Sequence, residues 1–254
     1  MPPDDCNAPI PLTREELLDQ DRRRLMLEAY PWLKALSDEE LERSLTKTMR
    51  KHPEGADVWV FAYGSLIWNP TFAFTEHRIA HIRGYHRRFC LRADMGRGTP
   101  ERPGLFLGLD RGGQCGGVVF RIPAAQAQHE LTLLWRREML TGAYIPRWLR
   151  AETQGGTVPA IAMTINRAYS RYVGDWSQDQ TIKAIATAEG RFGRCSDYLF
   201  NTLEHLTEMG VRDRMLERTA AGVRRFLDRP ANLDSVAQGI CDDVNGSAGN
   251  GYRR

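Results

Sequence analysis

The sequence contains no apolar run long enough to cross a bilayer, and its acidic, polar N-terminus lacks the apolar segment of a secretion signal. Its five cysteines lie far apart and include no Cys-x-x-Cys pair; they are Cys6, Cys90, Cys115, Cys195 and Cys241. Zinc ribbons and paired redox thiols are therefore excluded, and the odd number of cysteines is typical of reduced thiols in a cytosol. We expect a cytoplasmic protein that does not bind a membrane.

The chain also lacks a strong excess of either charge, since 35 Lys and Arg residues against 32 Asp and Glu residues give a formal net charge of +3. The basic residues are scattered and form no stripe with aromatic neighbours, so nucleic acid is not an expected partner. No obligate protein partner is indicated. A chain of 254 residues that is 42% hydrophobic can form one domain of ordinary size with further segments at its ends.

The order of patterns along the chain predicts an α+β fold. Capping boxes that begin at Thr13 and Ser37 predict a helical N-terminal extension over residues 1–55. Strands and helices then follow one another irregularly, which favours a mixed sheet curled into a barrel. The expected strands are 58–63, 78–92, 105–109, 117–122, 144–152 and 158–166, with a hairpin turn at 111–114; the expected helices are 124–140, 178–189, 197–209 and 213–227. Residues 229–254, rich in Gly, Asn, Asp and Ser, are predicted to be a flexible tail.

The most informative stretch is the apolar run 58–68, which a Tyr63-Gly64-Ser65 turn interrupts before the run resumes. Gly64 allows a strained or positive-φ backbone, and the successive N–H groups of Gly64 and Ser65 can converge on an anion. The turn is therefore either a cradle for a carboxylate or phosphate, or a bulge in a core strand. Ser65 lies outside any Gly-x-Ser-x-Gly pattern, so it is expected to donate a hydrogen bond and not to act as a nucleophile.

Glu138 lies at the end of the helix predicted over 124–140. Its spacing continues the apolar stripe formed by Leu131, Leu134 and Trp135, whereas Arg136 and Arg137 are expected to project elsewhere as surface charges. A glutamate is seldom buried unless it is paired or functional. Glu138 is therefore either a reactive carboxylate facing a cavity or a helix-end charge that is solvated or paired with a neighbouring arginine.

Other candidates carry weaker signals. His77, His81 and His86 lie in or near one strand but share neither a face nor a His-Glu-x-x-His pattern, so no metal site is predicted. The Gly-rich loop 94–104 is either a lid over a pocket or simply an exposed loop. Tyr198, at the start of a helix, is either an aromatic at the edge of the core or a phenol directed at a ligand.

Five stretches occur together in one order along the chain. They are Val60-Phe61-Ala62-Tyr63-Gly64-Ser65-Leu66-Ile67-Trp68, Gly84-Tyr85-His86-Arg87-Arg88-Phe89, Gly96-Arg97-Gly98-Thr99 leading to Pro103-Gly104, Glu130-Leu131-Thr132-Leu133-Leu134-Trp135-Arg136-Arg137-Glu138-Met139, and Gly193 leading to Tyr198-Leu199-Phe200. This combination resembles the ChaC family of glutathione-specific γ-glutamylcyclotransferases. The bacterial branch, which has a helical N-terminal extension, is the more similar one.

The resemblance implies a γ-glutamylcyclotransferase-like β-barrel flanked by helices, with residues 56–228 as the catalytic domain. It implies cleavage of glutathione into 5-oxoproline and cysteinylglycine, with Glu138 as the general acid and base and Tyr198 orienting the peptide. The implied substrate-binding stretch is Val60, Phe61, Ala62, Tyr63, Gly64, Ser65 and Leu66. Because the attacking amine belongs to the substrate, such an enzyme needs no covalent intermediate, metal or organic cofactor.

Two alternatives stay open on the sequence. The same turn would suit a cyclotransferase that acts on other γ-glutamyl amines or dipeptides. A γ-glutamyl-binding regulatory module without catalysis is the other alternative, although the presence of both the turn and Glu138 argues against it.

Overall fold

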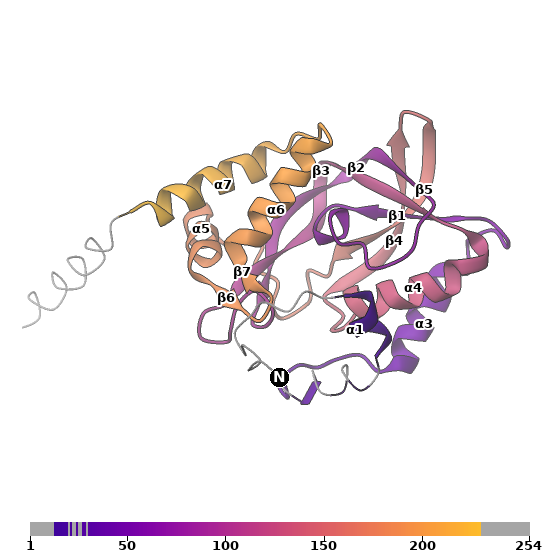
Figure 1. Ribbon diagram of the computed structural model, residues 1–254, viewed down its shortest axis with the longest axis horizontal. Helices are drawn as coiled ribbons and strands as arrows, with labels where there is room; N and C mark the ends of the chain where they lie inside the picture. Colours follow the sequence, from indigo (N-terminus) through magenta and orange to yellow (C-terminus); the bar gives the residue numbers. More distant parts are fainter. Residues whose placement is uncertain (1–12, 20, 22–23, 25–26, 29, 230–254) are drawn as a thin grey trace, which may run out of the picture.

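The computed structural model of the protein describes residues 13–19, 21, 24, 27, 28 and 30–229, so the flexible tail predicted from residue 229 lies almost entirely outside the described residues. Five strands close into a barrel in the order β1-β3-β2-β4-β5, which confirms the expected mixed barrel (Figure 1). These strands are β1 (Val58–Ala62), β2 (Glu76–Ala93), β3 (Gly104–Ile122), β4 (Tyr144–Thr153) and β5 (Gly156–Ile165). β1 runs parallel to β5 and antiparallel to β3, which places a parallel pair in an otherwise largely antiparallel sheet.

The two longest strands correct one prediction. The hairpin turn expected at 111–114 is wrong, because β3 runs unbroken from Gly104 to Ile122 and pairs with β2 along this length. Between the pairs Arg83–Gln114 and Tyr85–Arg111, two glycines of β3 lie opposite Gly84 alone. Gly112 and Gly113 have φ values of 100° and 70°, so the glycines predicted to make a turn form a β-bulge instead.

Helices flank the barrel on separate sides (Figure 1). They are α1 (Arg14–Leu18), α3 (Asp38–Met49), α4 (Ala124–Glu138), α5 (Gln178–Thr187), α6 (Cys195–Glu208) and α7 (Arg214–Leu227), together with a short β6–β7 pair at Glu189–Gly190 and Gly193–Arg194. α5, α6 and α7 pack together, whereas α3 and α1 lie against α4. The capping boxes predicted at Thr13 and Ser37 are present, and Ser177 caps the start of α5, within the helix expected from residue 178.

Apolar side chains from the barrel and the helices form a common core. Its fully buried members include Phe61, Leu107, Ile161, Trp135 and Leu199, which come from three strands and two helices. The apolar stripe of α4 thus supplies part of the barrel's packing, which fixes the direction in which this helix ends. None of the described helices is long and apolar enough to span a membrane.

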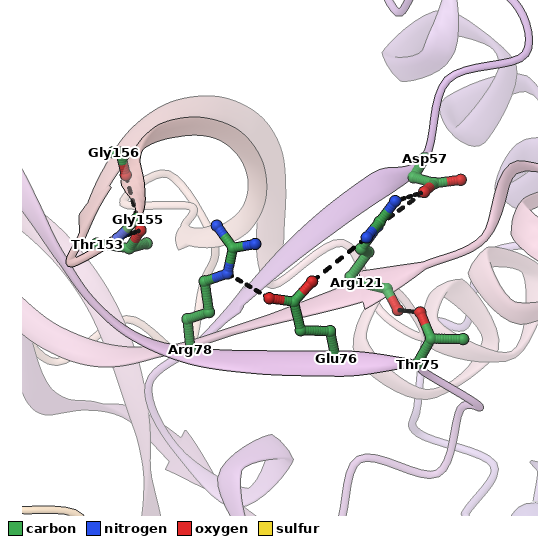
Figure 2. A network of polar contacts seen from close by, with 8 residues as sticks. All are labelled: Asp57, Thr75, Glu76, Arg78, Arg121, Thr153, Gly155 and Gly156. Carbon is green, nitrogen blue, oxygen red and sulfur yellow. Dashed lines mark hydrogen bonds and ion pairs between the residues drawn. The ribbon is translucent and has the colours of Figure 1, made fainter.

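An ionic network fixes the beginning of α4 (Figure 2). Arg121, near the end of β3, donates to Asp57 at 2.7 Å and to Glu76 at 3.4 Å, and Glu76 also pairs with Arg78. The second carboxylate oxygen of Asp57 accepts a hydrogen bond of 2.8 Å from the N–H of Ala124, the first residue of α4. Asp57 therefore satisfies a backbone donor at the helix start and holds it beside the barrel.

Candidate active site

The turn after β1 differs in detail from its prediction. Val60, Phe61 and Ala62 lie within β1, where their backbones pair with β3 and their side chains are buried. The apolar run does not resume as a strand, because Ser65–Ile67 form a short 3-10 helix. The N–H and C=O groups of a paired strand already form hydrogen bonds with the neighbouring strand. Within the predicted binding stretch, only residues 63–66 can therefore offer backbone N–H groups to a ligand.

Gly64 is required for a different reason from the one expected. Its φ is −137° and its ψ is −135°, so the backbone does not adopt the positive φ that was one of the two expected conformations. A Cβ at this position would lie 3.0 Å from the hydroxyl oxygen of Tyr198 and 3.7 Å from the Leu107 side chain. The absence of a side chain therefore lets Tyr198 of α6 approach the 63–66 turn closely.

Three successive N–H groups of this turn are available to a ligand. Within the described part of the chain, the N–H groups of Gly64, Ser65 and Leu66 have no acceptor, whereas those of Ile67 and Trp68 donate to the Gly64 and Ser65 carbonyls. Buried backbone donors are normally paired in folded proteins. Adjacent free donors of this kind can bind a carboxylate or a carbonyl oxygen.

Glu138 ends α4 with its side chain only 15% exposed, as the apolar stripe predicts. Burial raises the pKa of its carboxyl group, and the neighbouring Arg137 guanidinium opposes this rise. A raised pKa makes the carboxylate a better proton acceptor than an exposed glutamate at the same position. Met139 and Gly142 follow, and Gly142 adopts a φ of 70°, a left-handed conformation that lets the chain leave the helix sharply.

Arg137 overturns a second expectation, because its side chain is 6% exposed and does not project as a surface charge. Its Nε lies 3.0 Å from Glu138 Oε1, and one terminal nitrogen donates to Ser65 Oγ at 2.9 Å. The other terminal nitrogen donates to Thr71 Oγ1 at 3.1 Å and to the Asn69 carbonyl. Arg137 thus joins Glu138 to the 63–66 turn, two features that the sequence indicates separately.

Three tyrosines complete the site, of which Tyr63 and Tyr198 are buried and Tyr144 is half-buried. The Tyr63 hydroxyl donates to the Met163 carbonyl at 2.7 Å and the Tyr144 hydroxyl to the Leu107 carbonyl at 2.9 Å. Burial raises the pKa of Tyr63, Tyr144 and Tyr198, and the negative charge of Glu138 raises each of them further. The phenols of these three tyrosines therefore stay neutral.

Tyr198 has the features of both of its predicted roles, a core aromatic and a phenol directed at the site. It is 5% exposed and packs edge-on against Phe89 and Phe106, like a core aromatic, while its hydroxyl faces Gly64. Sequence reasoning missed Arg137 and Tyr144. The position of Arg137 next to Glu138 could have indicated that it belongs to the site. Tyr144 is the first residue of β4, and no local sequence pattern indicates that it does.

The other candidates take no part in the contacts that join Glu138 to the 63–66 turn. Within the described residues, no group of three or more His, Cys, Asp or Glu side chains is arranged to hold a metal ion. The 94–104 loop lines an open hollow of about 570 Å³ together with Tyr30 and Trp32 of the N-terminal extension and the turn at Gly190.

Comparisons with known proteins agree with this architecture. The family model of ChaC-like proteins matches residues 58–226. The glutathione-specific gamma-glutamylcyclotransferase of Escherichia coli (strain K12) is 37% identical over 220 residues, which cover 85% of this chain and 94% of that protein. Gamma-glutamylcyclotransferase 2-3 of Arabidopsis thaliana is 30% identical over 186 residues, which cover 70% of this chain and 94% of the relative.

A solved structure extends the comparison to three dimensions. A yeast gamma-glutamyl cyclotransferase specific to glutathione superimposes with a TM-score of 0.65 at 22% identity, over 70% of this chain and all (100%) of that one. This structural similarity establishes the fold. The family model and the sequence relatives establish the family. The chain belongs to the ChaC-like protein family.

Proposed function

We propose that this protein degrades glutathione as a glutathione-specific γ-glutamylcyclotransferase, with Glu138 as the group that moves the proton. The observation that carries the proposal is the buried Glu138 carboxylate, joined through Arg137 to a turn with three free N–H groups. The names of the relatives from Escherichia coli and Arabidopsis thaliana support the reaction class. We propose residues 56–228 as the catalytic domain, since every group of the site lies within it.

The first chemical step is proton removal from the α-ammonium group of the γ-glutamyl moiety. A free glutamate has a pKa of about 4.3 and is a weak acceptor for such a proton. Burial of Glu138 raises its pKa, which narrows the gap to the ammonium group. The Arg137 guanidinium lowers the pKa of Glu138 against this rise and so favours the ionised carboxylate, the form that can accept the proton.

The neutral amine then attacks the γ-carbonyl carbon and forms the new C–N bond of a five-membered lactam. Negative charge develops on the carbonyl oxygen, and the free N–H groups of Gly64, Ser65 and Leu66 are suited to bind this oxygen or the glutamyl carboxylate. When the original amide C–N bond breaks, Glu138 returns its proton to the departing cysteinyl nitrogen. The second proton of the attacking nitrogen then passes through the same carboxylate to that amine, so the lactam is neutral and cysteinylglycine leaves in its ammonium form. The products are 5-oxoproline and cysteinylglycine, and the enzyme regains its starting protonation state.

Positioning accounts for most of the expected acceleration, because nucleophile and electrophile belong to one molecule. Well-oriented intramolecular reactions reach effective molarities of about 10⁵–10⁸ M. The glutamyl chain must fold so that its amine meets its own γ-carbonyl. The Tyr198 hydroxyl beside Gly64 and the fixed Tyr63 and Tyr144 phenols supply polar walls for that folded conformation.

Substrate preference separates this proposal from a broader cyclotransferase. We expect purified protein to cleave glutathione far faster than γ-glutamyl-alanine or γ-glutamyl-lysine, measured as 5-oxoproline release at equal substrate concentrations. Equal rates on the three compounds would assign the protein to the broader class. Calorimetric binding of glutathione without any turnover would instead support the regulatory module.

Gly64→Val is expected to reduce the affinity for glutathione at least about tenfold, because a branched side chain must displace the Tyr198 hydroxyl. Calorimetry in a Glu138→Gln background prevents turnover during the measurement. Gly64→Ala is the graded comparison, since a single Cβ at 3.0 Å requires a shift of only a few tenths of an ångström. If the valine variant binds like its parent, the close approach of Tyr198 has no part in binding.

A further inference from the structure

The N-terminal extension reaches α4 through a paired arginine. Arg14, the first residue of α1, places its two terminal nitrogens 2.5 Å and 2.8 Å from the carboxylate oxygens of Glu130. The Glu130 side chain is only 4% exposed, and Arg14 keeps the pKa of this carboxyl low. A two-point pair between a guanidinium and a buried carboxylate has defined geometry, unlike most exposed ion pairs. α1 is therefore held in one position relative to α4.

The same two side chains also hold the segment 69–73. Arg14 donates to the Thr71 carbonyl at 3.3 Å, and Glu130 accepts a hydrogen bond of 2.8 Å from the Ala73 N–H. Thr71 has a φ of 55°, and no other described non-glycine residue has a positive φ. A β-branched residue in this region is strained and persists only when its surroundings impose it.

The other side of this segment contacts the site. Thr71 Oγ1 and the Asn69 carbonyl accept hydrogen bonds from Arg137, the residue that also contacts Glu138 and Ser65. The Asn69 N–H donates to the Ser65 carbonyl at 2.8 Å. Polar contacts therefore run without a gap from α1 through Thr71 and Arg137 to Glu138.

We propose that Arg14 is a positioning residue, through which the N-terminal extension sets the geometry of Arg137 and Glu138. This inference rests on the proposed function of Glu138. Arg14 and Glu130 clamp the strained Thr71, and Thr71 in turn presents the acceptors that orient the Arg137 guanidinium. Without the clamp, the 69–73 segment relaxes and Arg137 loses its fixed position beside the carboxylate.

The consequence is a change in kcat and in its pH dependence. The groups that face Glu138 are Arg137 on α4 and the neutral phenols of Tyr63, Tyr144 and Tyr198. Only Arg137 lowers the pKa of Glu138, so a displaced guanidinium leaves burial as the dominant influence and the pKa rises. The acidic limb of the pH–rate profile then moves to higher pH.

The test begins with Arg14→Ala. We expect kcat on glutathione to fall about tenfold or more, with KM changed less than about twofold, because misplaced catalytic groups lower turnover steeply. The acidic limb of the kcat profile should move upward in pH. A general loss of stability would lower the yield of folded enzyme without shifting that limb.

Arg121→Ala is the matched control. It breaks another arginine–carboxylate contact, that of Arg121 with Asp57 shown in Figure 2, and Asp57 also accepts from the first N–H of α4. The contacts of the 69–73 segment do not include Arg121. We expect a lower melting temperature but wild-type kcat and pH profile per folded molecule. An equal shift of the acidic limb in Arg121→Ala would contradict the proposal, since any loosening of α4 would then suffice.

Two variants at Thr71 keep the test informative if Arg14→Ala folds poorly. Thr71→Val removes the Oγ1 acceptor while Arg14 and Glu130 stay paired, and it should lower kcat and shift the limb as Arg14→Ala does. Thr71→Ser retains the acceptor and should restore both. Wild-type kcat and pH profile in Arg14→Ala or Thr71→Val would overturn the positioning role. Failure of the proposed function is distinguished by wild-type protein that releases no 5-oxoproline.

Discussion

Glu138→Gln is expected to lower the rate of 5-oxoproline formation by about 10²–10⁴-fold or more, because one carboxyl group serves both proton transfers. Glutathione binding should survive, since the amide has nearly the same size and shape. The melting temperature should change only modestly, because the amide oxygen can still accept a hydrogen bond from the Arg137 Nε that lies 3.0 Å from Glu138. Initial rates, calorimetric affinity and thermal unfolding are measured on one preparation.

Glu152→Gln provides the control for that substitution. Glu152 pairs with Arg83 on the surface, with a side chain that is 49% exposed, so its amide variant tests the same chemical change outside the site. We expect wild-type turnover from it. A folded Glu138→Gln variant with wild-type turnover would remove Glu138 from the mechanism, and a purely structural ion pair would then explain its burial.

Arg137→Met is expected to have the second-largest effect. Removing the guanidinium leaves burial to raise the Glu138 pKa without opposition, so the acidic limb of kcat/KM against pH moves to higher pH. At any pH below this limb, a higher pKa leaves less of the Glu138 carboxyl group in the ionised form that can accept a proton. The same change removes the hydrogen bond to Ser65, so the turn also loses a fixed side chain. Turnover should fall about tenfold or more because the base and the turn lose their shared contact, and the part of the loss that comes from the raised pKa should recover at higher pH.

Arg136→Met is the neighbouring control. Arg136 precedes Arg137 on α4 and donates to the Leu17 carbonyl in the N-terminal extension at 3.3 Å, away from Glu138. It should keep the wild-type pH profile, since Arg137 is the cation that lowers the pKa of Glu138. Unchanged profiles in both variants would contradict the role of Arg137 in setting the proton affinity of Glu138.

Local chemistry makes much of the fold readable from the sequence. Thr13, Ser37 and Ser177 indicate helix starts because a cap needs only a side-chain oxygen and the right spacing to the next turn. Helical periodicity places Glu138 with Leu131 and Trp135, because it sets which residues share a face. Such signals depend on neighbours in sequence, so they hold without knowledge of tertiary contacts.

The missed features depend on partners far along the chain. Arg137 precedes Glu138 by one residue, and helical periodicity places it on a different face of α4. Its guanidinium nevertheless donates hydrogen bonds to Ser65 and Thr71. The local sequence around Gly112 and Gly113 is typical of a hairpin turn. Because β2 pairs with β3 on both sides of these glycines, they form a β-bulge within β3 instead. The local pattern around Gly64 predicts a strained or positive-φ backbone, but it does not indicate that the hydroxyl of Tyr198, from a distant helix, lies against this glycine.

The most direct test of the central claim is product analysis after incubating the purified full-length protein with glutathione. Intramolecular attack predicts 5-oxoproline and cysteinylglycine in equal amounts, with no free glutamate, and both should disappear with Glu138→Gln. Free glutamate in place of 5-oxoproline would show hydrolysis by water, and the account of a cyclising amine would then be wrong. Unchanged glutathione under conditions where the protein is folded would contradict the proposed activity itself.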